Sequence, residues 1–283
     1  MKRGLVLEGG GMRGMFTCGI LDLLMEQGVR FDGLVGVSAG AAFGCNYKSG
    51  QIGRALRYNQ RFGRDSRYMG VRSLLTTGNY INAEFAYHTV PTQYDVFDGE
   101  AFERNPMEFH VVCTDTEQGS PVYRKLDKVD YEALEWMRAS ASMPLVSRPV
   151  ELDGMKLLDG GIVDSIPLRY FQEQGYKRNI VILTQPKGYF KKRTRLMPIF
   201  HLFLRNQPVV TRLMGERHLM YNAQLQYISE QEKLGNALLI YPEESIPISR
   251  TCSNPGKLKM VYDMGRKKGE QMLTQITDFL AVS

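Results

Sequence analysis

The first forty residues limit the fold most, because they combine a short apolar strand, a glycine-rich loop, a helix and a second apolar strand. Residues 4–7 predict the first strand and residues 34–37 the second. Between them, residues 13–27 place apolar side chains at helical spacing, and Gly28 ends the helix. Parallel strands need a crossover of this kind, so the sequence predicts a βαβ unit and an α/β fold.

Strand and helix patterns alternate along the rest of the chain. Further strands are predicted at residues 109–113, 157–158, 179–183 and 237–241, and further helices at residues 39–47, 131–141, 167–174, 208–228 and 257–280. A hairpin is predicted around residues 117–119, and residues 50–105 are expected to form helices that roof a site. We therefore expect residues 1–283 to form a single three-layer domain, a mostly parallel central sheet with helices on both faces. Its chemical motifs fall within residues 9–161, and residues 200–283 form a helical C-terminal part.

The composition narrows the class of protein without indicating its chemistry. Hydrophobic residues make up 43% and charged residues 23%, which is ordinary for a globular protein and excludes a disordered or collagen-like chain. The net charge of +6 is too small to indicate a nucleic-acid partner. The four cysteines lie far apart, so we expect neither a disulfide framework nor a zinc site.

The N-terminus and the hydropathy pattern bear on location. The first seven residues contain two cations and only a short apolar run, too little for a secretory signal. No segment approaches the ~18 apolar residues that span a bilayer. We expect a cytoplasmic protein whose membrane contact, if it has one, is peripheral.

A Gly-Val-Ser-Ala-Gly sequence at residues 36–40 stands between a predicted strand and a predicted helix. In that context the pattern G-x-S-x-G forms a nucleophile elbow. The turn is tight, so Gly36 and Gly40 leave room that side chains would fill. Ser38 is therefore the candidate nucleophile, and the helix that follows directs its positive end at a developing oxyanion.

The glycine loop after the first strand has two interpretations. It consists of Gly9, Gly10, Gly11, Met12, Arg13 and Gly14. As G-x-G-x-x-G, it matches a dinucleotide-binding loop of an NAD(P)-dependent oxidoreductase, with Asp32 as ribose ligand. However, Asp32 precedes the second strand, and a nicotinamide site needs no serine elbow. As an oxyanion hole, its Gly10 and Gly11 amides would face the carbonyl that Ser38 attacks.

Ser38 needs a base, and the residues alone leave the choice open. A triad of Ser38, Asp159 and His201 or His218 has the order of α/β-hydrolases. That fold places several strands before its nucleophile, whereas one strand and one helix precede Ser38 here. His88 and His110 have no motif around them. The other candidate is Asp159 alone, within the Asp-Gly-Gly sequence that includes Gly160 and Gly161.

Taken together, residues 9–14, 36–40 and 159–161 resemble the three signatures of the patatin-like phospholipases. Residues 113–115, 138–144 and 163–167 are also similar to bacterial members. The resemblance implies a Ser38–Asp159 dyad without histidine, an oxyanion hole in residues 9–14 that Arg13 buttresses, and hydrolysis of fatty acyl esters. For such a dyad we expect an acyl-enzyme intermediate, and our hypothesis includes no metal or organic cofactor. Ser165 stands where the family has asparagine, a departure we expect to affect a helix cap.

Weaker features complete the expectations. Residues 187–205 mix cations with aromatic residues, which suits an anionic membrane surface as well as a solvated loop. We expect Asp115 to cap a turn, and Ser140 and Ser142 to cap or pack at a helix end. The preferred hypothesis is a lipid acyl hydrolase acting on phospholipid or lysophospholipid. A noncatalytic lipid-binding protein is a further alternative.

Overall fold

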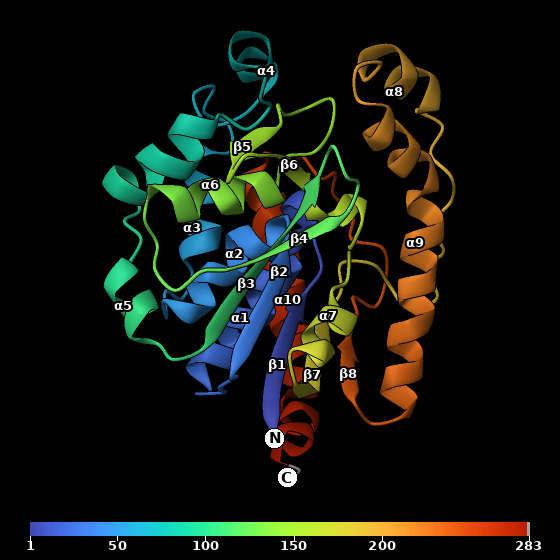
Figure 1. Cartoon of the computed structure of the whole chain (residues 1–283). Helices are drawn as coiled ribbons and strands as arrows, with labels where there is room; N and C mark the ends of the chain where they lie inside the picture. Colours follow the sequence, from blue (N-terminus) through green and yellow to red (C-terminus); the bar gives the residue numbers. More distant parts are fainter. Residues whose placement is uncertain (282–283) are drawn as a thin grey trace.

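The computed structural model describes residues 1–281 and shows an α/β fold around one mixed sheet (Figure 1). The strands are β1 Lys2–Leu7, β2 Gly33–Val37, β3 Glu108–Asp115, β4 Pro121–Lys125, β5 Val150–Leu152, β6 Met155–Asp159, β7 Tyr176–Ile182 and β8 Ala237–Ile240. The α-helices are α1 Met15–Glu26, α2 Ala39–Lys48, α3 Arg54–Phe62, α4 Val71–Thr77, α5 Gly99–Arg104, α6 Tyr131–Ser140, α7 Leu168–Glu173, α8 Met197–Phe203, α9 Pro208–Lys233 and α10 Pro255–Ala281. Two 3-10 helices, η1 Gly11–Gly14 and η3 Gly160–Ile162, and a π-helix, η2 Glu84–Tyr94, complete the elements.

The sheet has eight strands in the order β5-β6-β3-β2-β1-β7-β8, and β4 pairs with β3. Strands β3, β2, β1, β7 and β8 run parallel, whereas β4, β5 and β6 pair antiparallel. The predicted mostly parallel sheet is therefore confirmed, with an antiparallel extension beyond β3.

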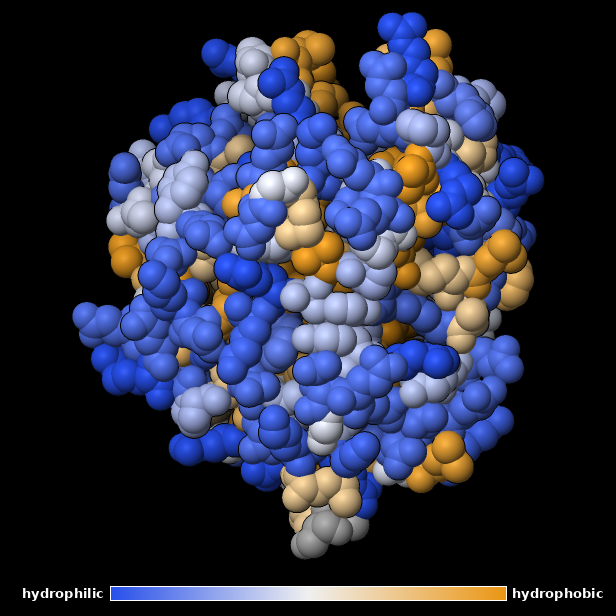
Figure 2. Space-filling model, in the orientation of Figure 1, coloured by the Kyte–Doolittle hydropathy of each residue, from blue (hydrophilic) through white to orange (hydrophobic). Residues whose placement is uncertain are grey.

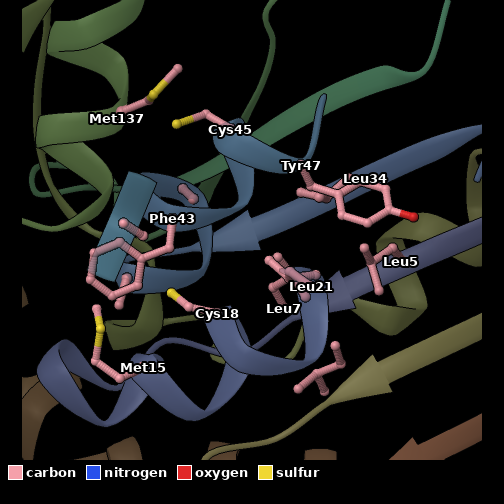
Figure 3. Close-up of a cluster of buried hydrophobic side chains, with 14 of the residues drawn as sticks. Leu5, Leu7, Met15, Cys18, Leu21, Leu34, Phe43, Cys45, Tyr47 and Met137 are labelled. Atoms are coloured by element: carbon pink, nitrogen blue, oxygen red, sulfur yellow. The ribbon is translucent and has the colours of Figure 1, made fainter. Parts of the chain in front are cut away.

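Side chains that alternate along the parallel strands supply two separate cores, as the period of two of a strand requires. On one face, Leu5 and Leu7 of β1 pack with α1, α2, α6 and α10. Figure 3 shows part of this cluster, with Leu7 close to Leu21 and Phe43 close to Met15. On the other face, Val6 packs with α7 and α9 through Phe171 and Tyr221. Burial on both faces explains why these strands are continuous apolar runs.

The predicted elements agree with the structure except at their ends. The helix expected at residues 13–27 begins as η1 and continues as α1, and the strand expected at 179–183 begins at Tyr176. Residues 50–105 contain the helices α3, α4, η2 and α5, so the predicted helical segment is confirmed. The hairpin joins β3 to β4, and Asp115 caps its turn by accepting from the Glu117 and Gln118 amides at 2.8 and 3.0 Å. Both expectations for this turn are confirmed.

The pairing along β3 brings two chain segments together. β2 pairs with β3 up to Val37 opposite Val112, and β6 pairs with β3 from Asp159 opposite Cys113. β4 occupies the other edge over this stretch, so β2 and β6 follow one another along the same edge. Because β6 is antiparallel, its last residue meets the end of β2, and Asp159 lies beside the elbow at Ser38.

Candidate active site

Ser38 occupies a strained turn between β2 and α2, as the G-x-S-x-G sequence predicts. Its backbone has φ 55° and ψ −123°, a conformation that residues other than glycine rarely adopt. A Cβ on Gly36 would lie 2.6 Å from the Ala41 nitrogen, and one on Gly40 would lie 2.5 Å from the Leu7 carbonyl oxygen. Both contacts are to backbone that cannot withdraw, so the elbow needs glycine at these two positions.

A buried serine from α6 fixes the elbow. The Ser38 amide donates a hydrogen bond to Ser140 Oγ at 2.8 Å, and that hydroxyl donates to the Val112 carbonyl of β3 at 2.7 Å. Ser140 is fully buried. The expectation that Ser140 merely caps or packs at a helix end was too weak, since its side chain holds the candidate nucleophile's backbone.

Asp159 ends β6, and several hydrogen bonds hold its backbone and carboxylate. Its amide donates to the Ser142 carbonyl at 2.8 Å, and its carbonyl accepts from Thr114 Oγ1 at 2.8 Å. Its Oδ1 accepts from the Gly161 amide at 2.7 Å. These contacts fix the carboxylate at the end of the strand, close to Ser38.

Burial raises the pKa of Asp159, because the charged carboxylate loses its hydration. The Ser38 hydroxyl and the Arg217 guanidinium oppose this shift but do not cancel it. In this conformation Oδ2 is buried without a full hydrogen bond from any described residue. A carboxylate with a raised pKa and a free oxygen accepts a proton more readily than a solvated one.

The glycine loop lies directly against the elbow, because β1 and β2 are adjacent and parallel. A Cβ on Gly9 would lie 2.8 Å from Ser38 Cβ. Within residues 1–281, the amides of Gly9, Gly10 and Gly11 have no hydrogen-bond partner, whereas the Met12 amide donates to the Arg250 carbonyl at 2.9 Å. The loop therefore presents unpaired backbone donors beside the serine.

Buried polar contacts hold the glycine loop in place. Glu8 accepts hydrogen bonds from the Thr184 amide at 2.6 Å and from the Tyr221 hydroxyl at 2.6 Å. Thr184 Oγ1 in turn lies 3.0 Å from the Gly9 carbonyl oxygen, to which it donates. A side chain on Gly10 would collide with Thr184, its Cβ lying 2.8 Å from that oxygen. Arg13 Nε donates to the Gly10 carbonyl at 3.5 Å, a long contact. Sequence patterns gave no signal for Glu8, Thr184 or Tyr221.

Arg217 is another residue of the site without a local signal in the sequence. It lies within α9, far along the chain from the motifs, and its Nε donates to the Gly161 carbonyl at 2.5 Å. The same carbonyl accepts from Ser165 Oγ at 2.8 Å. The expectation that Ser165 concerns a helix cap was therefore wrong, because the N-cap of α7 is Pro167 and Ser165 braces the Asp-Gly-Gly turn.

The structure separates Asp32 from the glycine loop. Asp32 precedes β2 and accepts from the Arg3 amide at 2.7 Å, at the edge of the sheet where the strands begin. The glycine loop lies where the strands end. Asp32 cannot contact a ribose held by that loop, so the dinucleotide interpretation loses its acidic ligand.

The histidines do not complete a triad in the described residues. His88 pairs with Glu135 at 2.8 Å, and His110 contacts Tyr170 at 2.9 Å. His201 is exposed on α8. His218 lines the cavity at Ser38, contrary to its expected surface or packing role, but it forms no hydrogen bond with Ser38 or Asp159.

A cavity of about 580 Å³ opens at Ser38 and Asp159. Ser38, Asp159 and residues 8–13 line one part of it. The side chains that extend it beneath the helices of residues 50–105 are mostly apolar or aromatic and include Tyr58, Tyr80, Ala86, Val90 and Phe97. The predicted roof is therefore a wall of the cavity.

The chain is similar to known proteins. Residues 5–171 match the family described as patatin-like phospholipase, and residues 207–281 match a domain of unknown function. The uncharacterized protein YjjU of Escherichia coli is 30% identical over 98% of this chain and 78% of its own length. Lysophospholipase nte1 of Aspergillus terreus is 24% identical over 96% of this chain, which spans only 18% of that protein.

A solved structure, VipD from Legionella pneumophila, aligns with 97% of this chain and 67% of its own at a TM-score of 0.49 and 12% identity. The serine elbow and the extent of the family match define a class of lipid hydrolases. The chain belongs to the patatin-like phospholipase family.

Proposed function

We propose that this protein hydrolyses acyl esters of phospholipids or lysophospholipids, with Ser38 as nucleophile and Asp159 as base. The observation that supports the proposal most is the placement of a strained serine, a buried carboxylate and unpaired loop amides around one cavity. The fungal relative named a lysophospholipase supports the same class of substrate.

In the acylation step, Ser38 Oγ attacks the ester carbonyl carbon while its proton passes to Asp159. The amides of Gly10 and Gly11 would stabilise the oxyanion, and each such donor is typically worth about 3 kcal/mol in the transition state. Met12 contributes through its place in the loop and not through its amide, which is already paired. Gly14 lies at the end of η1, where its lack of a side chain leaves room for Phe43.

The intermediate then collapses, and the leaving alcohol takes the proton from Asp159. Water attacks the acyl-enzyme as Asp159 accepts its proton, and Ser38 recovers a proton when the fatty acid leaves. The raised pKa of Asp159 makes this carboxylate a better base than a solvated aspartate. Catalysis with this one carboxylate as the base would therefore depend both on the burial of Asp159 and on the preorganised oxyanion hole.

The apolar part of the cavity suits the acyl chain. Its lining includes Phe43, Tyr58, Val90 and Met137. Arg54 also lines the cavity, and its guanidinium lies 5.2 Å from the centre of the Tyr58 ring. Burial of methylene groups contributes about 0.8 kcal/mol each. We therefore assign this apolar part, the apolar arm of the cavity, to a fatty acyl chain.

Two short helices at one end of the molecule expose apolar side chains, α4 and α8 (Figures 1 and 2). Leu75 of α4 is 80% exposed, and Phe203 of α8 is 70% exposed. Lys192, Arg193 and Arg195 precede α8. We propose that residues 187–205 contact an anionic membrane surface, since apolar side chains enter the interface while cations meet lipid phosphates. No helix within residues 1–281 combines the length and apolar content needed to cross a bilayer.

We further propose that the whole chain acts as one domain. Arg217 and Arg250 come from the C-terminal part, yet both line the cavity that the N-terminal motifs form.

Hydrolysis of lysophosphatidylcholine and of p-nitrophenyl butyrate tests the proposed function. Ser38→Ala and Asp159→Asn should each lower kcat by a factor on the order of a thousand, as the loss of a nucleophile or its base does. His218→Ala and Ser66→Ala, which changes an exposed serine, should retain activity. Activity that survives Ser38→Ala, or that is lost with His218→Ala while Asp159→Asn remains active, would contradict the mechanism.

A further inference from the structure

Four cationic side chains gather on one side of the cavity, beside the glycine loop. They are Arg13, Lys191, Arg217 and Arg250, which all line the cavity. Each is close enough to others of the group to alter their proton affinities: Arg250 lowers the pKa of Arg13, and Arg217 and Arg250 lower that of Lys191. In both cases the larger cause is burial of the charge. The four charges therefore share one small, partly desolvated space.

No carboxylate neutralises these cations directly. Within residues 1–281, none of the four forms an ion pair within 4.0 Å. Two carboxylates act on the group at longer range, Glu8 and Asp159, and both hold other partners. Four cations against two carboxylates leave an excess of positive charge, which is costly to bury without a counter-ion.

Lys191 shows how burial and neighbouring cations act on one member of the group. Its surroundings lower the pKa of its ammonium group to about 7, first through burial and then through Arg217 and Arg250. Nevertheless its position is fixed, because its amide and carbonyl both pair with the Asn222 side chain at 2.9 and 3.0 Å. Its Nζ lies 4.5 Å from the centre of the Tyr221 ring. Near neutral pH this amine is therefore only about half protonated, and an anion bound beside it would favour the charged form.

We propose that Arg13, Lys191, Arg217 and Arg250 form a subsite that binds the phosphate group of the substrate next to the scissile ester. The inference rests on the proposed function and adds the part of the substrate that is recognised. In a glycerophospholipid the phosphate is separated from the acyl carbonyl by only a few bonds. Arg217 donates a hydrogen bond to the Gly161 carbonyl, close to Asp159. A phosphate bound in this subsite would therefore place the acyl ester of the same lipid next to Ser38. Charge-assisted hydrogen bonds to phosphate are the strongest such contacts available here.

The same inference gives a role to the C-terminal segment. Arg217 on α9 and Arg250 in the loop before α10 both lie within residues 207–281, the part that matches a domain of unknown function. This segment contains β8 and two of the helices that cover the sheet, α9 and α10. It would in addition supply two of the four phosphate ligands.

A matched pair of esters tests the subsite. Lysophosphatidic acid and monoacylglycerol with the same oleoyl chain differ only by the phosphate group. Lys191→Met and Arg250→Met should lower kcat/KM for the phosphate ester by about tenfold or more, the loss of a charge-assisted contact, and for the neutral ester by no more than about twofold. Lys191→Arg should restore much of the loss. Lys233→Met removes an exposed cation from the end of α9 and should change neither value.

The outcomes separate this inference from the proposed function. Equal losses on both esters in Lys191→Met and Arg250→Met would overturn the subsite while leaving a Ser38-dependent esterase intact. Ester hydrolysis that survives Ser38→Ala would instead overturn the proposed function. Inorganic phosphate should compete with lysophosphatidic acid in the wild type and less so in Lys191→Met. A wild type that cleaves both esters equally, although inorganic phosphate inhibits it, would show a free-phosphate site and overturn recognition of the substrate.

Discussion

The Ser140 hydroxyl accepts the backbone N–H of Ser38 at 2.8 Å, a contact between residues 102 positions apart. Because Ser140 also donates to the Val112 carbonyl, it ties the elbow to β3. Two residues after Ser140, the Ser142 carbonyl accepts a hydrogen bond from the Asp159 amide. Residues 140–142 therefore fix both members of the proposed dyad relative to one another.

Ser140→Ala should slow catalysis more than it weakens the fold. It leaves the Ser38 amide without its buried acceptor, which costs about 1–3 kcal/mol, part of which falls on the alignment of the nucleophile. We expect kcat to fall by about tenfold or more while KM changes little. Ser142→Ala is the matched control, since its hydroxyl donates only to the Arg138 carbonyl, and its backbone contact with Asp159 remains. Equal losses of kcat in the two variants would show that Ser140 has no special part in positioning Ser38.

Asp159→Asn should stabilise the folded protein at neutral pH while it removes activity. Burial raises the pKa of Asp159 in the folded state above its unfolded value. Its ionisation therefore costs stability as pH rises through the interval between the two values, and below the unfolded pKa the cost is absent. Asparagine has no charge to bury, so we expect a gain in the free energy of unfolding near neutral pH that shrinks in acid.

Urea unfolding at about pH 7 and about pH 4 measures this difference. Asp278→Asn, at an exposed position on α10, serves as the control and should have no effect at either pH. A destabilised Asp159→Asn protein at neutral pH would show that the surrounding cations favour the carboxylate more than burial disfavours it.

Gly9→Ala should inactivate the enzyme without unfolding it. The new Cβ would lie 2.8 Å from Ser38 Cβ and 3.0 Å from the Val37 carbonyl oxygen, so the loop must shift away from the nucleophile. We expect a loss of kcat on the order of a hundredfold, comparable to losing an oxyanion-hole donor. Gly256→Ala places its Cβ no nearer than 3.4 Å to another atom and should retain activity. Normal turnover by Gly9→Ala would argue against close contact between the loop and the serine.

Ala86→Leu should shorten the acyl chains that the enzyme accepts. Ala86 lines the apolar arm of the cavity, and three added carbons there occupy space that the far end of a long chain would fill. We expect kcat/KM for oleoyl esters to fall by about tenfold, with butyryl esters changed by about twofold or less. Ala83→Leu, at a neighbouring position outside the cavity lining, is the control. A parallel loss for short and long chains would remove this arm from the acyl site.

Local patterns in the sequence were sufficient for much of the fold and for the choice of Ser38 as the candidate nucleophile. The strands are buried on both faces, so their apolar runs are visible, and the elbow at Ser38 is encoded within five residues. Asp159 was inferred mainly from a family resemblance, because a single Asp-Gly pair is usually only a turn. Its position beside Ser38 follows from the pairing of β6 along β3, which no local pattern specifies.

The supporting residues could not be predicted, since their roles depend on contacts across the fold. Ser140 has the sequence context of a helix end, and only the structure shows its contact with Ser38. Arg217 lies in a long helix with nothing to distinguish it from a surface arginine. Lys191 was noted only as one of several cations in residues 187–205, and its placement over Tyr221 depends on α9.

The central claim, that Ser38 is the nucleophile activated by Asp159, is tested most directly by locating a fluorophosphonate adduct by mass spectrometry. We predict a single adduct on the peptide that contains Ser38, none in Ser38→Ala, and labelling of Asp159→Asn slower by about a hundredfold or more. An adduct on Ser140 or Ser142, or labelling that persists unchanged in Ser38→Ala, would contradict the claim.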